Sequence, residues 1–110
     1  MEFKMVEFSE EVKSFLFSYT PEDECITSLS EIKQIREVLD LESCKSVDDF
    51  TAIRNTVVKY YKDLKDEYVE YDGAGNHYFK DIDRYFQLSN SMMSVTAVID
   101  HYIYAKFNTL

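Results

Sequence analysis

The sequence predicts an all-α fold, a single-domain irregular bundle of four to five helices, and three observations lead to this prediction. The 110 residues include only two glycines and one proline, whereas an all-β chain needs a turn about every 8–12 residues and usually places those residue types there. Apolar residues make up 45% of the chain, which suffices for the core of one domain of this length. Apolar side chains also recur at helical spacing. Residues 1–110 are therefore expected to form one helical domain.

The first third of the chain contains three predicted helix starts. Residues 5–19 place a set of apolar side chains on one helical face, namely Met5, Phe8, Val12, Phe15, Leu16 and Tyr19. Thr20 and Pro21, followed by acidic residues, have the pattern of a capped start and predict a short helix of at most two turns. Ser28, with Glu31 three residues later, has the pattern of a capping box and predicts a third helix.

A long helix is predicted after the polar break at residues 43–46. Ser46 and Asp49 form its expected start. Apolar side chains then keep to one face for about six turns, which predicts a helix as far as Tyr71. The members of this stripe are Phe50, Ile53, Val57, Tyr60, Tyr61, Leu64, Tyr68 and Tyr71.

The last third of the chain predicts a long helical hairpin around Gly73 and Gly75. Both glycines lie in the loop at residues 72–76, and a helix is expected to follow from about His77 to Phe107. Residues 89–91, Ser-Asn-Ser, are expected to kink or split it, because such side chains compete for backbone hydrogen bonds. Residues 92–107 are nearly apolar on all sides, which is typical of the most buried helix of a bundle.

The charge of the chain indicates the kind of partner it binds. Acidic residues number 21 and basic residues 12, giving a net charge of −9. This sign disfavours direct binding to nucleic acid or to an anionic membrane and favours a basic protein partner. No apolar run of membrane-spanning length occurs, and the acidic N-terminus does not resemble a signal peptide. Two cysteines, Cys25 and Cys44, are too few for a disulfide framework, so we expect free thiols and a cytoplasmic location.

Patterns for catalysis or for bound cofactors and metals are incomplete in this sequence. A phosphate-binding glycine loop and a nucleophile motif are both missing. His77 and Asp81 could share a helical face, but two ligands do not make a structural metal site. The loop at residues 72–76 has some features of a calcium loop, yet Asp83 stands where that motif requires a bidentate glutamate. His101 is expected in the core or at its rim. We therefore expect no cofactor, no metal and no enzymatic activity.

The first candidate binding site is an acidic stripe near the end of the long predicted helix. Its carboxylates fall at positions i, i+3, i+4 and i+7 and would span roughly 10 Å. Tyrosine is a preferred residue in binding hot spots, and carboxylates steer a basic partner. The stripe comprises Asp63, Asp66, Glu67 and Glu70, flanked by Tyr68 and Tyr71 and running into Asp72.

The second candidate site is the acidic cluster of Glu22, Asp23 and Glu24, just after Pro21. The first 31 residues contain eight acidic and two basic residues, so most of the negative charge lies in the N-terminal part of the chain. For each cluster the alternative is a solvated helix surface or a helix cap without a binding role.

Three functions are consistent with these features. The first is an inhibitor, of the immunity or antitoxin type, that neutralises a basic nucleic-acid-processing partner such as a nuclease toxin. In size and composition the chain resembles small acidic immunity proteins of bacterial toxin systems, although no motif supports that resemblance. The second is a phage-type DNA mimic that blocks a defence nuclease, which would need a long continuous acidic face. The third is a structural or regulatory helical module, in particular a homodimer, which would expose an apolar stripe on the first helix or on residues 92–107.

Overall fold

The computed structural model describes residues 5–23 and 27–107, and it confirms the all-α class and the bundle of helices. The elements, in chain order, are α1 (Glu10–Ser18), α2 (Leu29–Val38), the 3-10 helix η1 (Leu41–Ser43), α3 (Val47–Asp66), β1 (Val69–Tyr71), β2 (His77–Phe79) and α4 (Ile82–Phe107). Within the described ranges, no helix combines the length and the apolar composition that crossing a membrane requires.

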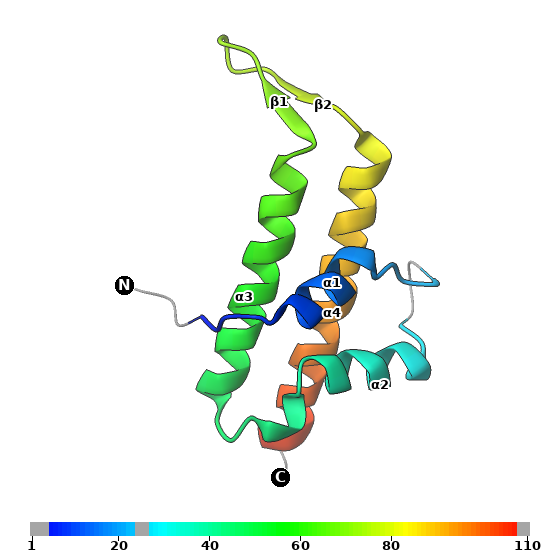
Figure 1. Cartoon of the computed structure of the whole chain (residues 1–110), viewed down its shortest axis with the longest axis vertical. Coiled ribbons are helices and arrows are strands. Elements are labelled where there is room, and N and C mark those ends of the chain that lie inside the picture. The colour runs from blue at the N-terminus through cyan, green and yellow to red at the C-terminus, as the bar shows by residue number, and fades with distance from the viewer. Residues whose placement is uncertain (1–4, 24–26, 108–110) are drawn as a thin grey trace.

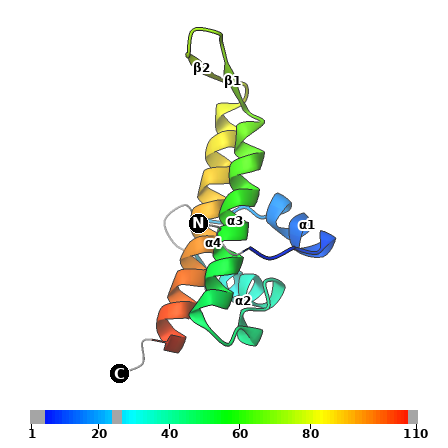
Figure 2. The ribbon, with the colours of Figure 1, turned by 90° about the vertical axis from the view of Figure 1, so that its left-hand side faces the viewer.

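The two long helices α3 and α4 form an antiparallel hairpin, and α1 and α2 lie on one face of it (Figure 1; Figure 2). The side-chain contacts that join the two long helices include an ion pair and a hydrogen bond. Arg54 pairs with Asp100 at 2.8 Å, and the Lys65 ammonium donates to the Ser89 hydroxyl at 3.3 Å. A two-stranded ribbon of β1 and β2 extends the hairpin beyond the other helices (Figure 1). The molecule therefore has a body, where four helices pack, and a projecting ribbon end.

Serine side chains cap the first three α-helices. The hydroxyl of Ser9 accepts a hydrogen bond from the backbone of Val12 at the start of α1. Ser28 and Ser46 cap α2 and α3 in the same way, each at 3.2 Å from an N–H three residues later. Such caps satisfy N–H groups that have no partner within the helix. The predicted starts at Ser28 and Ser46 are confirmed, whereas α1 begins later than expected because Ser9 caps it.

The predicted short helix after Thr20 is wrong for residues 20–23, which are not helical. Polar groups of α2 and α4 bind this segment instead. The Ser91 hydroxyl donates to the carbonyl of Tyr19 at 2.8 Å, and the Glu31 carboxylate accepts from the backbone N–H of Glu22 at 3.3 Å. These contacts hold the segment in a non-helical path, which the capping pattern alone could not reveal.

The hairpin is confirmed, but its two helices stop short of the loop. Residues 69–71 and 77–79 pair as antiparallel strands, with Glu70 opposite Tyr78, so the predicted extensions of both helices are wrong. Valine and aromatic residues favour strands, and Gly75 adopts a φ of 89°, which allows a tight turn. The predicted break at residues 89–91 is also absent from α4, which runs without interruption. The buried Ser91 hydroxyl bonds to the carbonyl of Gln87 and does not displace the helix backbone.

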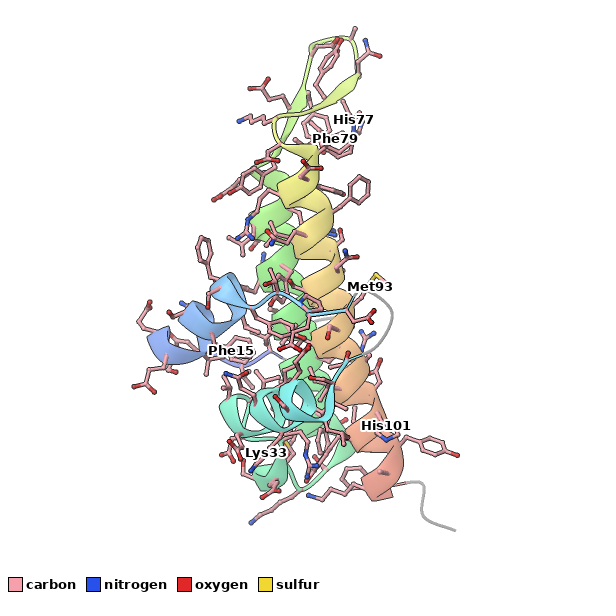
Figure 3. The ribbon with its side chains drawn as sticks, turned by 90° about the vertical axis from the view of Figure 1, so that its right-hand side faces the viewer. Phe15, Lys33, His77, Phe79, Met93 and His101 are labelled. Atoms are coloured by element: carbon pink, nitrogen blue, oxygen red, sulfur yellow. The ribbon has the colours of Figure 1, made fainter. Side chains whose placement is uncertain are left out.

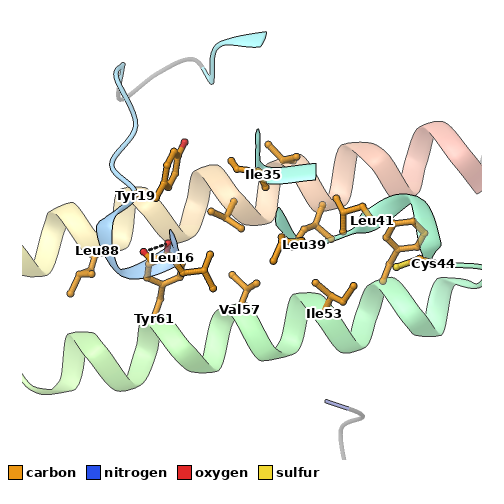
Figure 4. Packing of buried hydrophobic residues seen from close by; sticks show 14 residues of the cluster. Leu16, Tyr19, Ile35, Leu39, Leu41, Cys44, Ile53, Val57, Tyr61 and Leu88 are labelled. Atoms are coloured by element: carbon orange, nitrogen blue, oxygen red, sulfur yellow. Dashed lines mark hydrogen bonds between the residues drawn. The ribbon is translucent and has the colours of Figure 1, made fainter. Parts of the chain in front are cut away.

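The core lies between α3 and α4 on one side and α1, α2 and η1 on the other (Figure 4). Its fully buried members are Leu16, Ile35, Leu41, Phe50, Val57, Tyr61 and, from α4, Val95 and Ile99. The prediction that residues 92–107 are the most buried holds only for their first half, since Tyr104 is 64% exposed. The core therefore ends before the ribbon and before the last turns of α4.

Candidate binding surface

The ribbon end is shaped by a loop in which Asp72 is the central acceptor. Its carboxylate accepts hydrogen bonds from the backbone N–H groups of Ala74 and Asn76 and from the Asn76 side chain, each at 2.9 Å. The bonds from Asn76, together with those from Ala74 and from the Tyr78 hydroxyl, lower the pKa of Asp72 below its usual value. The predicted binding residue Asp72 therefore has a structural role in the turn.

The predicted acidic stripe does not form one helical face. Asp63 and Asp66 lie on α3 and Glu67 is its C-terminal cap, but Glu70 lies on β1. Asp63 pairs with Lys59 at 3.1 Å and Glu70 pairs with a lysine of the ribbon at 3.6 Å. Asp66 and Glu67 are exposed and form no ion pair with another described residue. All four carboxylates still lie at the same end of the molecule, with two of them neutralised by neighbours.

The two predicted tyrosines have different surroundings. Tyr68 is half-buried and packs against the core, so it connects the ribbon to the body. Tyr71 is 63% exposed and contacts the imidazole of His77 across the strand pair, with ring centroids 4.5 Å apart. Only Tyr71 is therefore available to a partner.

The ribbon carries an aromatic face that the sequence did not predict. Side chains of Tyr71, His77 and Phe79 share one face of the paired strands, because residues two apart on a strand point the same way. Phe79 continues this face onto α4, where its ring lies 4.9 Å from that of Tyr85 and 6.1 Å from that of Phe86. His77 and Phe79 project at the ribbon in Figure 3. Tyr71, His77 and Phe79, with the carboxylates of Asp66 and Glu67 at the end of α3, are called the ribbon-end surface below, whereas Glu70 and Tyr78 lie on the opposite face of the ribbon.

The second predicted cluster lies beside the start of α4. Glu22 and Asp23 are exposed, and Glu24 is outside the described residues. Thr20 and Pro21 form one wall of an open hollow of about 660 Å³ whose other wall includes Asp81 and Asp83. The structure thus brings the N-terminal acidic segment alongside two further carboxylates that follow the ribbon.

The most enclosed carboxylate in the described part of the chain is that of Glu31, which is 5% exposed. It accepts from the Tyr19 hydroxyl at 2.5 Å and from the Ser28 hydroxyl at 3.2 Å. The Tyr19 hydroxyl also lies 2.7 Å from that of Ser94, which in turn lies 2.9 Å from that of Thr27. Burial alone would raise the pKa of Glu31, but these donors and the backbone N–H groups of Glu22 and Ser28 lower it below its usual value. Every partner is internal, so the network joins α1, α2 and α4 and leaves no group for chemistry.

The histidines and the cysteine that the structure describes lie on separate elements: His77 on β2, His101 on α4 and Cys44 at the end of η1. Among the described residues, no group of three or more His, Cys, Asp or Glu side chains could hold a metal ion. His101 is exposed on α4, contrary to the expected core or rim position, and lies far along the helix from His77. Cys44 is buried, and burial raises the pKa of its thiol. A buried thiol that resists ionisation is a poor nucleophile.

Sequence reasoning missed Phe79 because the residues around it were assigned to a helix. The run His-Tyr-Phe after a glycine loop, opposite Val-Glu-Tyr, is a hairpin signal that could have identified the ribbon. The chain matches no known protein family, and neither curated proteins nor solved structures show significant similarity to it.

Proposed function

We propose that this protein is a non-enzymatic binding protein that captures a basic protein partner through the ribbon-end surface, as an inhibitor of a nucleic-acid-processing enzyme such as a nuclease. One observation carries the proposal: the ribbon exposes aromatic side chains at the same end of the molecule where α3 ends with Asp66 and its cap Glu67, whose carboxylates have no ion-pair partner among the described residues. Aromatic side chains supply binding energy, while carboxylates accelerate and orient the encounter with a basic surface.

The position of Asp66 and Glu67 supports a role outside folding. Both lie at the C-terminus of α3, where the helix dipole is negative and a carboxylate costs about 0.3–1 kcal/mol. Lys65 is the basic residue of this last turn, but its ammonium donates to the Ser89 hydroxyl on α4. Two acids at an unfavourable end of a helix are better explained by binding than by stability.

The shape of the charged area favours an inhibitor with a compact interface over a DNA mimic. Lys65, Lys80 and Arg84 lie among the carboxylates at this end, so the acidic face is interrupted. A DNA mimic would require regularly spaced, continuous negative charge in place of phosphates. A short acidic area mixed with aromatic side chains matches the arrangement expected of an immunity-type inhibitor.

The test is to recover a basic partner at low salt, by co-purification from the native host or by co-expression with a neighbouring gene product, and to measure its nuclease activity with and without this protein. Inhibition by the wild-type protein is expected. The double variant Asp66→Ser/Glu67→Ser should weaken binding about tenfold and flatten its salt dependence. Phe79→Ala should weaken it by a similar or larger factor.

The matched control removes the same charge elsewhere. Glu11 and Glu37 are exposed acids on α1 and α2, and Glu11→Ser/Glu37→Ser should leave affinity within about twofold of the wild type. Equal losses in the two double variants would mean that net charge, and not the ribbon-end surface, governs binding. Recovery of no basic partner at low salt would contradict the proposal itself.

A further inference from the structure

A second exposed surface runs along α4 on the side opposite the core. Its apolar members, called the outer face of α4, are Ile82, Phe86, Met93, Ala97 and Tyr104. Spacings of four and seven residues keep them within about 60° around the helix axis. Met93 is 62% exposed and Tyr104 is 64% exposed, and Figure 3 shows Met93 projecting outward from the middle of α4. This is the apolar stripe on residues 92–107 that a dimerisation module was expected to expose.

The charge on this face differs from that of the rest of the chain. Its acidic residues among the described positions are Asp100, which pairs with Arg54 of α3 at 2.8 Å, and Asp83 at its edge. The face is therefore nearly neutral on a protein of net charge −9. A basic partner would gain little electrostatic attraction here. A second apolar face packed here would instead remove apolar surface on both molecules from water, which favours association.

The outer face is arranged symmetrically about Met93. Ile82 lies eleven residues before it and Tyr104 eleven residues after it, while Phe86 and Asp100 lie seven residues before and after. If two copies pack antiparallel, each Ile82 meets the partner's Tyr104, and each Phe86 meets the ion-paired Asp100 of the partner subunit. The apolar ends of the face thus cover each other.

A small residue and a polar pair complete this match. Ala97 lies four residues after Met93, is exposed and leaves room for the partner's Met93, whereas Ser89, four residues before, is half-buried and bonded to Lys65 of α3. Asp83 and His101 lie ten residues before and eight after Met93, on the same edge of the helix. In the antiparallel arrangement each Asp83 therefore lies near the partner's His101, a pairing of a carboxylate with an imidazole.

We propose that the outer face of α4 is a homodimer interface in which two copies pack their α4 helices antiparallel about a two-fold axis at Met93. The 26 residues of α4 present a strip about 39 Å long and 10 Å wide. A standard interface takes about 800 Å² from each partner, which is near a tenth of the 7659 Å² that this chain exposes. The strip supplies about half of that area, so a weak, concentration-dependent dimer is expected.

The first test measures the oligomeric state of the purified full chain by sedimentation over a range of concentrations. A monomer–dimer equilibrium is expected. Met93→Glu should raise the dissociation constant on the order of a hundredfold, because two carboxylates meet at the axis and the burial of two methionines is lost. The control Leu29→Glu makes a comparable change on α2, at a residue that is 85% exposed, and should leave the equilibrium unchanged.

The second test establishes the antiparallel register. His101→Asp alone places two carboxylates together at two symmetry-related positions, and Asp83→Lys alone removes the carboxylate that faces the imidazole; each should weaken the dimer roughly threefold to tenfold. The double variant Asp83→Lys/His101→Asp should restore the wild-type dissociation constant, because each lysine then meets an aspartate. Circular dichroism and thermal unfolding of each variant verify that the monomer remains folded.

Salt separates this proposal from the binding of a basic partner. Two copies of negative net charge repel each other, so added salt should strengthen the dimer, whereas it should weaken binding to a basic partner. A monomer at all concentrations up to about 1 mM would overturn the proposal without affecting the proposed inhibitor function. A dimer that Met93→Glu leaves intact, or that the double charge variant does not restore, would overturn the proposed interface or its register.

Discussion

The body and the ribbon end of this molecule use the same residue type in opposite ways. In the body, the hydroxyls of Tyr60 and Tyr61 donate to backbone carbonyls of α1 at 3.0 and 2.8 Å, and both rings pack with the core. At the ribbon end, Tyr71 and Tyr78 are more than half exposed. Tyr60 and Tyr61, predicted on the apolar stripe of the long helix, hold α1 in place, whereas the tyrosines predicted at the binding site were Tyr68 and Tyr71. Exposure, and not residue type, distinguishes the two regions.

The difference implies that stability and binding depend on separate parts of the chain. The fully buried side chains all belong to the body, whereas every residue of β2 is exposed. Changes in the body should therefore alter folding first, and changes at the ribbon end should alter binding with little effect on folding.

The largest expected effect is the loss of a core side chain in the body. Phe50 is fully buried and packs against the ring of Tyr102 at 5.4 Å, so Phe50→Ala should lower the free energy of unfolding by about 3–5 kcal/mol. Phe79 at the ribbon is 47% exposed, and Phe79→Ala should cost less than about 1 kcal/mol. Urea unfolding followed by circular dichroism measures both, and equal costs would remove the distinction between body and ribbon.

The next largest effect concerns the buried carboxylate of Glu31. Glu31→Gln leaves the hydroxyls around it without an ionised acceptor and should cost about 1–3 kcal/mol at neutral pH. The pKa of Glu31 in the folded state lies below its ordinary value of 4.5. The ionised carboxylate therefore contributes fully to the free energy of unfolding above pH 4.5, and this contribution is lost as the pH falls through the lowered pKa. Unfolding free energies measured from pH 7 to pH 3 should fall less steeply for Glu31→Gln. If the unfolding free energies of the wild type and Glu31→Gln fall in parallel with pH, another carboxylate causes the acid sensitivity.

A smaller effect is expected in the ribbon loop. Gly75 has a φ of 89°, which an alanine adopts only with strain, so Gly75→Ala should cost about 1 kcal/mol. Gly73 has no such backbone angle, and neither glycine has a neighbour that an added methyl group would meet. Thermal unfolding of Gly73→Ala should therefore stay within about 0.5 kcal/mol of the wild type. A larger loss of stability for Gly73→Ala than for Gly75→Ala would show that the critical backbone conformation of the turn lies at Gly73.

The smallest expected change has the opposite sign. Asp66→Ser/Glu67→Ser removes two negative charges from the C-terminus of α3 and should leave stability unchanged or raise it, by up to about 0.5 kcal/mol. Chemical unfolding at low salt detects this gain best, since salt screens the helix dipole. A clear loss of stability would show that these carboxylates support the fold and would weaken the argument that they are kept for binding.

Local sequence signals were sufficient where a helix end depends on its own side chains. The caps at Ser28 and Ser46 were predictable because a serine hydroxyl bonds an N–H only three residues away. The capping pattern at Thr20 failed because distant groups on α2 and α4 bind the backbone of that segment. The acidic nature of the candidate site was likewise visible in the sequence.

The geometry of the site was not predictable, because it depends on where α3 ends. Residues 69–71 satisfy a helical spacing of apolar side chains, yet strand pairing with residues 77–79 gives their backbone groups partners across the loop. That choice moves Glu70 off the helical stripe and brings Tyr71 against His77. Helical periodicity is judged within one segment of the sequence, so it contains no information about strand pairing with another segment.

The internal hydrogen bonds of the body also constrain how the chain folds. The α3–α4 hairpin closes over a short loop, whereas the hydroxyls of Tyr19 and Ser94 meet across 75 positions in sequence. Short-range closure is faster than long-range closure, so the hairpin should form early and α1 should dock last. Substitutions at Tyr19 should therefore speed unfolding while leaving the refolding rate almost unchanged.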